Sequence, residues 1–387
     1  MKITSNIYLK NFKYKISNNK ILKLFTKLKD EKNPILVSMS KDYRDSYRSK
    51  DLLNFRNIKQ VNIIGMGGSI LGAKAIYNFL EDKIKRKFTF IDNLIKKNTK
   101  KSKSKDLYLV ISKSGNTLET IVNSNILIKK KHQSIFITEN KNSYLMQLAE
   151  KIKSEVIHHN NFIGGRYSVL SEVGMLPAEL MGFKQSNLRR LNYLIKNKKF
   201  INSLITSVTN TLKLTQKKKC NSIILNYDER SKDLFFWYQQ LQAESLGKKG
   251  KGILPIISSM PKDNHSLMQF YLDGYQKNFF TFFFVNDDNS QKIIENEILR
   301  SHSYLKNKDI NKILFSQLLA TEKVFKKKNI PFRSFFIAKR SEQALGELFT
   351  FFILETILLG RAMELNPFNQ PAVELIKEQK KKNLVKI

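Results

Sequence analysis

The chain has 387 residues, in which 69 lysines and arginines oppose 33 aspartates and glutamates and give a formal charge of +36 at pH 7. Hydrophobic residues make up 41% of the chain and aromatic residues 11%, which excludes a disordered or collagen-like protein and supplies cores for two or three domains. The one cysteine, Cys220, excludes an internal disulfide framework, so a cytoplasmic location is expected.

The positive charge is scattered rather than gathered into one block. Short lysine runs lie near predicted helix ends or in loops, at 129–131, 217–219, 326–328 and 380–382. We interpret them as solvated surface and expect no specific nucleic-acid partner, although a positive field would steer anionic metabolites towards a cleft. The longest apolar runs, 278–285 and 348–360, are shorter than the roughly 18 residues that a membrane span requires. No membrane segment is therefore predicted.

Short β-rich runs alternate with helical periods in two stretches of the chain. In the first stretch, strands are predicted at 60–65, 87–92, 106–112 and 134–139, with helices after residue 69 and near 117–131. A helical bridge at 186–216 precedes the second stretch, which has strands at 221–226, 252–258, 279–285 and 333–338 and helices at 231–246, 264–273 and 311–328. Two further helices follow at 341–362 and 370–382. The alternation predicts two α/β units with parallel sheets in tandem.

Two glycine-containing loops each follow a predicted strand and precede a helix. GMGGS, Gly65 to Ser69, has the strand-turn-helix setting in which backbone N–H groups approach a ligand, although a plain tight turn is the alternative. SKSGNT, Ser112 to Thr117, places three hydroxyl groups beside the free N–H groups of a helix start. This arrangement suits a phosphate group, while an ordinary helix cap is the alternative. The loop lacks a Walker-type GK[ST], which argues against a nucleoside triphosphate.

An arginine and a carboxylate are candidates for chemistry on a bound anion. Arg166 lies in GGRYS, between glycines and a helix, and could hold an anion or stabilise developing negative charge, unless it is an ordinary surface residue. Glu244 shares a helical stripe with Trp237 and Leu241, so we expect it to lie on the packed face. Burial raises the pKa of a carboxyl group towards that of a useful general base. The alternative is that Glu244 reaches around the edge of the helix to solvent or to a lysine. Gln240, one turn earlier, could hold a hydroxyl group or water.

Further candidates come from the C-terminal half. His265 stands at the carboxyl end of a predicted strand, the edge of an open α/β sheet that ligands favour. Gln370 immediately precedes the last helix, and Lys377 follows about two turns later on the same face. The histidines show no metal-ligand spacing, so no metal site is expected.

Taken in order, GMGGS, SKSGNTLET, GGRYSVLSEVG, QQLQAESLGK, PKDNHS and FNQPAVELIK resemble the glucose-6-phosphate isomerase family, also called phosphoglucose isomerase. The resemblance covers residues 60–380 and implies two sugar-isomerase (SIS) domains, each a three-layer α/β sandwich around a mainly parallel sheet. It implies an N-terminal segment at 1–50 packed on the core, SIS domains at 51–183 and 184–345, and C-terminal helices at 346–387 that complete the active site.

The same resemblance assigns roles to residues. It implies that Glu244 shuttles a proton between the first two carbons of an open-chain sugar, that Arg166 faces the enediolate intermediate, and that His265 and Lys377 open the ring. The substrate-binding residues that it implies are Gly68, Ser69, Ser112, Lys113, Ser114, Thr117, Gln240 and Gln370. It also implies a sugar-phosphate substrate, a reaction without a cofactor, and a homodimer in which His265 acts across the interface.

Three other functions compete with reversible isomerisation of glucose 6-phosphate and fructose 6-phosphate in glycolysis and gluconeogenesis. One is an isomerase of the same fold that also accepts mannose 6-phosphate, because epimer preference depends on small displacements of hydroxyl contacts. The second is a non-catalytic sugar-phosphate sensor, which has no need of a base or a ring-opening pair. The third, a nucleic-acid binder, rests on charge alone.

Overall fold

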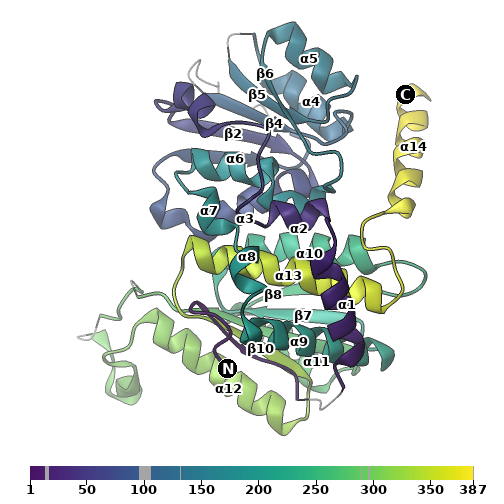
Figure 1. Ribbon diagram of the computed structural model, residues 1–387. Helices are drawn as coiled ribbons and strands as arrows, with labels where there is room; N and C mark the ends of the chain where they lie inside the picture. The colour runs from purple at the N-terminus through teal and green to yellow at the C-terminus, as the bar shows by residue number, and fades with distance from the viewer. Residues whose placement is uncertain (14–16, 96–105, 131, 289, 295–296, 387) are drawn as a thin grey trace.

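Two five-stranded sheets organise the computed structural model, which describes residues 1–13, 17–95, 106–130, 132–288, 290–294 and 297–386 (Figure 1). The first sheet is parallel throughout and has the order β3-β2-β4-β5-β6. Its strands are β2 (Gln60–Gly65), β3 (Lys87–Ile91), β4 (Leu107–Ile111), β5 (Gln133–Thr138) and β6 (Glu155–His158). Buried apolar residues fill β2 and β4, as both faces of a parallel sheet are covered by helices.

The second sheet repeats the order of the first and borrows a strand from the N-terminus. Its parallel strands β7 (Asn221–Asn226), β8 (Leu254–Ser259), β9 (Asn278–Val285) and β10 (Phe332–Ile337) lie in the order β8-β7-β9-β10. At the far edge, β1 (Ile7–Lys10) pairs antiparallel with β10. Strand β1, whose four residues alternate between buried and exposed, was not predicted from the sequence. Strand β6, a short strand at the edge of the first sheet, was not predicted either.

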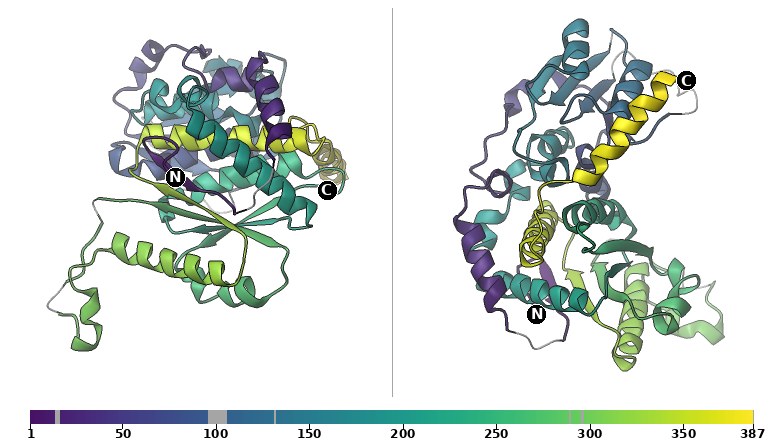
Figure 2. Two further views of the ribbon diagram at one scale, coloured as in Figure 1. Left: turned by 60° about the horizontal axis from the view of Figure 1, so that its bottom comes forward. Right: turned by 90° about the vertical axis from the view of Figure 1, so that its right-hand side faces the viewer.

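Helices cover both sheets and join them. Those associated with the first unit are α3 (Leu71–Phe79), α4 (Leu118–Leu127), α5 (Tyr144–Ile152) and α6 (Glu172–Leu180). Those associated with the second are α10 (Lys232–Leu246), α11 (Met268–Asp273) and α12 (Ile310–Lys327). On the second sheet, α12 covers the face turned away from α13 (Figure 2). The N-terminal segment contributes α1 (Asn19–Asp30) and α2 (Pro34–Ser38).

The predicted helical bridge at 186–216 is broken into three helices. These are α7 (Gln185–Leu188), α8 (Leu191–Leu194) and α9 (Lys198–Gln216). The break follows from buried side-chain contacts: Arg189, at the end of α7, is buried and binds Asp45 at 2.7 Å. The guanidinium group thus turns the chain towards the N-terminal segment, which a periodicity argument does not detect.

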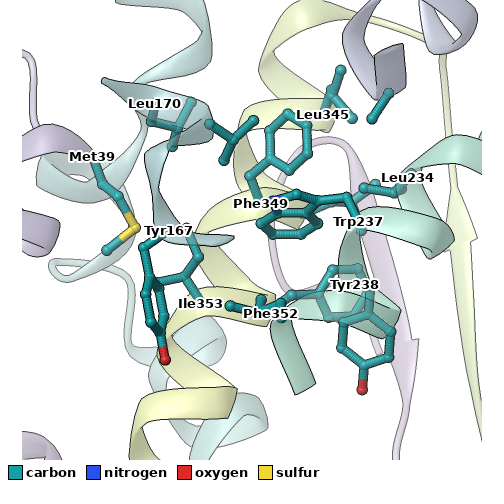
Figure 3. Packing of buried hydrophobic residues seen from close by; sticks show 14 of the residues in the cluster. Met39, Tyr167, Leu170, Leu234, Trp237, Tyr238, Leu345, Phe349, Phe352 and Ile353 are labelled. Carbon is teal, nitrogen blue, oxygen red and sulfur yellow. The ribbon is translucent and has the colours of Figure 1, made fainter. Parts of the chain in front are cut away.

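Helix α13 (Glu342–Ala362) forms the centre of the molecule, and α14 (Pro371–Lys386) follows it. By length and composition α13 could cross a membrane, but 94% of its apolar window is buried inside the fold, as in a core helix. Trp237 of α10 meets Phe349 edge-on at 4.8 Å, and Tyr238 packs on Phe352 at 4.5 Å (Figure 3). Full burial of each such side chain stabilises the fold by about 1.5–3 kcal/mol. Helix α10 is therefore fixed against the core.

The carboxyl edge of the second sheet is joined to the first unit by an ion-pair cluster. Arg340, after β10, donates to both carboxylate oxygens of Asp228 at 2.7 and 3.2 Å. The same guanidinium donates to the carbonyl of Phe79 at 3.3 Å and lies 4.9 Å from the Phe79 ring, at the end of α3. Arg230 of the second unit also forms an ion pair with Asp82, which follows α3 in the first unit. The cluster therefore lies at the carboxyl edge of the second sheet. The equivalent edge of the first sheet carries the two glycine-containing loops.

Candidate active site

The two predicted glycine-containing loops meet at one edge of the first sheet. Gly65 to Ser69 follows β2 and Ser112 to Thr117 follows β4, and these strands are neighbours. From β2 the chain crosses to β3 on one side, whereas from β4 it crosses to β5 on the other. This reversal of strand order opens a crevice at the carboxyl ends of the strands, where α/β proteins bind ligands.

The loop from Ser112 to Thr117 has the geometry of an anion cradle. The hydroxyl groups of Ser112 and Thr117 lie 3.0 Å apart, at the start of α4. Thr117 occupies the cap position, yet its side chain makes no cap hydrogen bond. Gly115 has φ +65°, and a Cβ there would lie 2.1 Å from the Ser143 hydroxyl oxygen, so the turn requires glycine. Free N–H groups and a hydroxyl pair therefore face the same loop.

Lys113 and Ser114 complete this loop. The ammonium group of Lys113 donates to the carbonyl of Asn161 at 2.8 Å and lies 3.5 Å from the Glu139 carboxylate. The Ser114 hydroxyl accepts from the backbone N–H of Asn116 at 3.2 Å, which shapes the turn. A positive charge is thereby held at the side of the cradle.

The GMGGS loop packs directly on the loop that carries Arg166. A Cβ on Gly68 would lie 2.1 Å from the carbonyl carbon of Gly165 and 2.5 Å from the backbone nitrogen of Arg166. The 3₁₀ turns Gly67–Ser69 and Gly165–Leu170 therefore touch backbone to backbone. Glycine at 68 is explained by this close approach, and Ser69 beside it stays half-buried.

Arg166 is the centre of the site. Its side chain is 3% exposed, and its Nε donates to the Ser245 hydroxyl at 2.8 Å. Nη1 donates to Glu244 Oε2 at 3.1 Å and to Gln370 Oε1 at 2.8 Å. Nη2 donates to the carbonyl oxygens of Pro367 and Asn369 at 2.7 and 3.1 Å. Arg166 is not an ordinary surface arginine, because every nitrogen of its guanidinium is engaged.

Glu244 lies at the rim of the core rather than on its packed face. Trp237 and Leu241 are buried as predicted, but the Glu244 side chain is 28% exposed, so the predicted burial was wrong in degree. The reason is that Glu244 lies, with Gln239, Gln240 and Ala243, on the face of α10 that borders a cleft. Gln240 Nε2 donates to Glu244 Oε1 at 2.8 Å, while Gln240 Oε1 is buried with no partner among the described residues. One carboxylate thus receives hydrogen bonds on both oxygens and still meets solvent.

A cleft of 520 Å³ opens beside this pair between α3 and α10. It is lined by Leu71, Lys74, Asp92, Asp233, Phe236, Gln239, Gln240, Ala243 and Glu244. Lys74 lies 3.0 Å from Asp92 and 3.6 Å from Asp233. Burial lowers the pKa of Lys74, but the two carboxylates outweigh it and the net shift is upward. This trio was not predicted from the sequence, since only the packing of α3 on α10 brings its members together.

The structure does not bring every predicted residue into the site. His265 follows the 3₁₀ turn Lys262–Asn264 after β8 and is exposed, and no described interaction joins it to Glu244 or Arg166. The predicted helix at 264–273 begins only at Met268. The backbone of Lys377 lies in α14, but its side chain lies outside the described residues. In the part of the chain that the structure describes, no group of His, Cys, Asp and Glu could hold a metal ion.

Comparison with known proteins decides the family. A family model described as phosphoglucose isomerase matches residues 35–254. This chain belongs to the phosphoglucose isomerase family. It is 31% identical over 360 residues to the glucose-6-phosphate isomerase of Methanocaldococcus jannaschii, covering 88% of each chain. It is 32% identical over 360 residues to that of Mycoplasmopsis pulmonis, covering 85% of this chain and 83% of the relative. The predicted family is confirmed.

Solved structures of other proteins have the same fold as this chain. A hypothetical protein from Thermus thermophilus superposes with a TM-score of 0.82 at 24% identity, covering 95% of this chain and 94% of that one. A glucose-6-phosphate isomerase from Chlamydia trachomatis superposes with a TM-score of 0.72 at 19% identity, covering 90% of this chain and 78% of that one. The predicted α/β fold class with mainly parallel sheets is confirmed.

Proposed function

We propose that this chain interconverts glucose 6-phosphate and fructose 6-phosphate, as its named relatives indicate. The observation that carries the proposal is the contact of Arg166 with Glu244 at 3.1 Å, at the sheet edge that also presents the loop from Ser112 to Thr117. A carboxylate, a fixed cation and an anion cradle are the parts that an aldose–ketose isomerisation of a phosphorylated sugar requires. We propose that the reaction takes place in the cytoplasm, within glycolysis and gluconeogenesis.

In this mechanism the phosphate group anchors the open-chain sugar. Its oxygens accept from the hydroxyl groups and backbone N–H groups of the cradle and from Lys113. Gly68 and Ser69 contact the sugar, and Gln240 and Gln370 hold its hydroxyl groups. Because the phosphate is bound equally in substrate and product, these contacts serve affinity and orientation rather than the chemical step.

Glu244 then acts as the base. Its carboxylate takes the proton from the carbon next to the carbonyl, and the electron pair forms a double bond while negative charge develops on the carbonyl oxygen. Arg166 stabilises that charge, which exists only in the transition state and the enediolate. The proton of the neighbouring hydroxyl group passes to the former carbonyl oxygen, and Glu244 returns its proton to the former carbonyl carbon as the new carbonyl group forms. Atoms and charge therefore balance without a hydride acceptor.

Ring opening is assigned to His265 and Lys377, with His265 supplied by a second copy of the chain. The exposure of His265 and its lack of a described contact with Glu244 support a role outside its own subunit. Co-expression of His265→Gln with Glu244→Gln tests this arrangement, because a heterodimer would carry one intact site. Recovery of about a quarter of wild-type activity is expected from random pairing, and recovery of none would contradict the shared site.

The primary experiment is a coupled assay of fructose 6-phosphate conversion on the wild type and on Glu244→Gln. Loss of the base is expected to lower kcat by about 10²–10⁴-fold, with sugar-phosphate binding retained. Glu229→Gln, the same change at an exposed residue just before α10, is the matched control. A wild type that binds sugar phosphate without turnover would instead indicate a sensor. Turnover of mannose 6-phosphate at a similar rate would indicate a dual isomerase.

A further inference from the structure

The turn that follows the proposed base is unusually compact and rich in lysine. Residues Gly247 to Gly252, GKKGKG, connect α10 to β8, with Lys248 and Lys251 paired across the turn as an antiparallel bridge. Lys249 has φ +52° and Gly250 φ +67°. A Cβ on Gly252 would lie 2.8 Å from the Cα of Gly247, so the two ends of the turn touch. The turn therefore presents its lysines from a closed backbone loop.

Two of these lysines bind the segment that leads to the last helix. Lys248 Nζ donates to the carbonyl of Asn366 at 2.5 Å, and Lys251 Nζ donates to the carbonyl of Met363 at 3.0 Å. Arg166 holds the next carbonyl groups of this segment, those of Pro367 and Asn369. The backbone between α13 and α14 is thus fastened by cations from two loops that are remote in sequence.

Of the two lysines, Lys248 is the one whose pKa is shifted by Arg166 and Glu244. It stands four residues after Glu244, and its hydrogen bond to Asn366 adjoins the carbonyl groups that Arg166 holds. Burial and, to a smaller extent, the charge of Arg166 lower the pKa of Lys248 from 10.5 to about 8, against the opposing effect of Glu244. Lys248 is therefore within electrostatic range of the whole Arg166–Glu244 pair. The charged groups that shift this pKa are Arg166 and Glu244, while Lys249 and Lys251 lie on the same turn and Glu364 lies on the segment that Lys248 binds.

We propose that Lys248 is a positioning residue: by holding the carbonyl of Asn366, it keeps the segment 366–370 against Arg166 and so aligns the guanidinium group with Glu244. The segment supplies Arg166 with the Pro367 and Asn369 carbonyls and the Gln370 side chain. Release of Asn366 loosens these contacts together, because all lie within five consecutive residues. The kinetic consequence rests on the proposed function, whereas the structural consequence does not.

The test compares Lys248→Met with Lys248→Arg and Lys249→Met. Lys248→Met is expected to lower kcat by about tenfold to a hundredfold, because Arg166 is no longer aligned with Glu244. The KM for fructose 6-phosphate is expected to change by less than roughly threefold, because the phosphate cradle is untouched. Lys248→Arg keeps a donor of sufficient reach and is expected to restore most of kcat. Lys249→Met removes the same charge from the same turn at an exposed residue, without a described hydrogen bond, and is expected to behave as wild type.

Hydrogen exchange of the amides at 363–370 is the second readout. Exchange is expected to accelerate in Lys248→Met, to stay near wild type in Lys248→Arg, and to be unchanged in Lys249→Met, with thermal melting confirming that each variant is folded.

If the wild type shows no turnover, the proposed function fails while the exchange experiment still decides the role of Lys248. Wild-type exchange in folded Lys248→Met would overturn the inference, as would equal loss of kcat in Lys249→Met. Should Lys248→Met fail to fold, exchange in Lys248→Gln decides it, because the shorter side chain does not reach Asn366: faster exchange than in the wild type supports the role and equal exchange overturns it.

Discussion

Nη1 of Arg166 lies 3.1 Å from Oε2 of Glu244, although 78 positions separate the two residues in the chain. The loop that carries Arg166 packs on the GMGGS turn, and the helix that carries Glu244 packs on α13, so each partner is fixed by a different part of the core. These contacts hold the backbone of each partner, and the hydrogen bond between Nη1 and Oε2 joins the two side chains. The pair is therefore preorganised, which is the condition for electrostatic stabilisation of a developing charge.

Replacement of Arg166 by lysine should separate charge from geometry. Lysine keeps one positive charge but cannot bind Glu244, Ser245 and the Pro367 carbonyl at once. We expect kcat to fall by about 10²–10³-fold with a much smaller change in KM. Steady-state kinetics with fructose 6-phosphate measures both constants. Arg56→Lys, at an exposed residue, is the control, and a KM effect larger than the kcat effect would assign Arg166 to binding instead.

Gly68→Ala should destabilise the fold at the junction of the two loops. The new Cβ would meet the backbone of Gly165 at 2.1 Å, and backbone atoms cannot rotate away as a side chain would. We expect the free energy of unfolding in urea to fall by about 1–3 kcal/mol. Gly164→Ala is the matched control, because its nearest contact would be Tyr167 at 3.9 Å. Equal losses in the two variants would argue against the close approach as the cause.

Thr117→Val tests the anion cradle with almost no change in side-chain volume. It removes the hydroxyl group that lies 3.0 Å from that of Ser112 at the start of α4. We expect KM for the phosphorylated sugar, and the inhibition constant of inorganic phosphate, to rise by about tenfold, the loss of one hydrogen bond to a charged group. Thr26→Val, on the exposed face of α1, should change neither constant. Unaltered phosphate inhibition would remove Thr117 from the cradle.

The lowered pKa of Lys248, about 8, predicts a limb in the pH profile. The amine is charged below that pH and becomes neutral as the pH rises through it, so the charge-assisted hydrogen bond to Asn366 weakens on the alkaline side. We expect the kcat of the wild type to decline above about pH 8, and that of Lys248→Arg to decline less because arginine stays protonated. Initial rates from pH 7 to 10 measure this, and identical alkaline limbs would assign the decline to another group.

Arg340→Met tests the cluster that joins the two units. The variant would leave Asp228 without its bidentate partner while both residues are nearly buried, with side-chain exposures of 10% and 11%. We expect a loss of about 2–4 kcal/mol in the free energy of unfolding, measured by urea denaturation. Arg48→Met breaks the exposed pair with Asp51 and should cost far less. Comparable losses would indicate that the Arg340 cluster does not fasten the units together.

Much of the local structure could be predicted because it depends on neighbouring residues. The apolar run QVNIIG predicted both ends of β2, and the glycines and hydroxyl residues after β2 and β4 predicted loops at one sheet edge. Elements whose existence depends on distant partners were missed. Strand β1 is recognisable only through its pairing with β10, and the break between α7 and α9 follows from the contact of Arg189 with Asp45.

The sequence by itself determined which candidate groups are available: a loop with hydroxyl groups suited to an anion, a guanidinium group and a carboxylate, each attached to the end of a strand or helix. Only the tertiary structure decided which of these groups meet. Gln370 reaches Arg166 across 204 positions, and Lys74 meets Asp92 and Asp233 through helix packing. The physical reason is that periodicity and propensity act over a few residues, whereas such distances are set by how whole elements pack around the core.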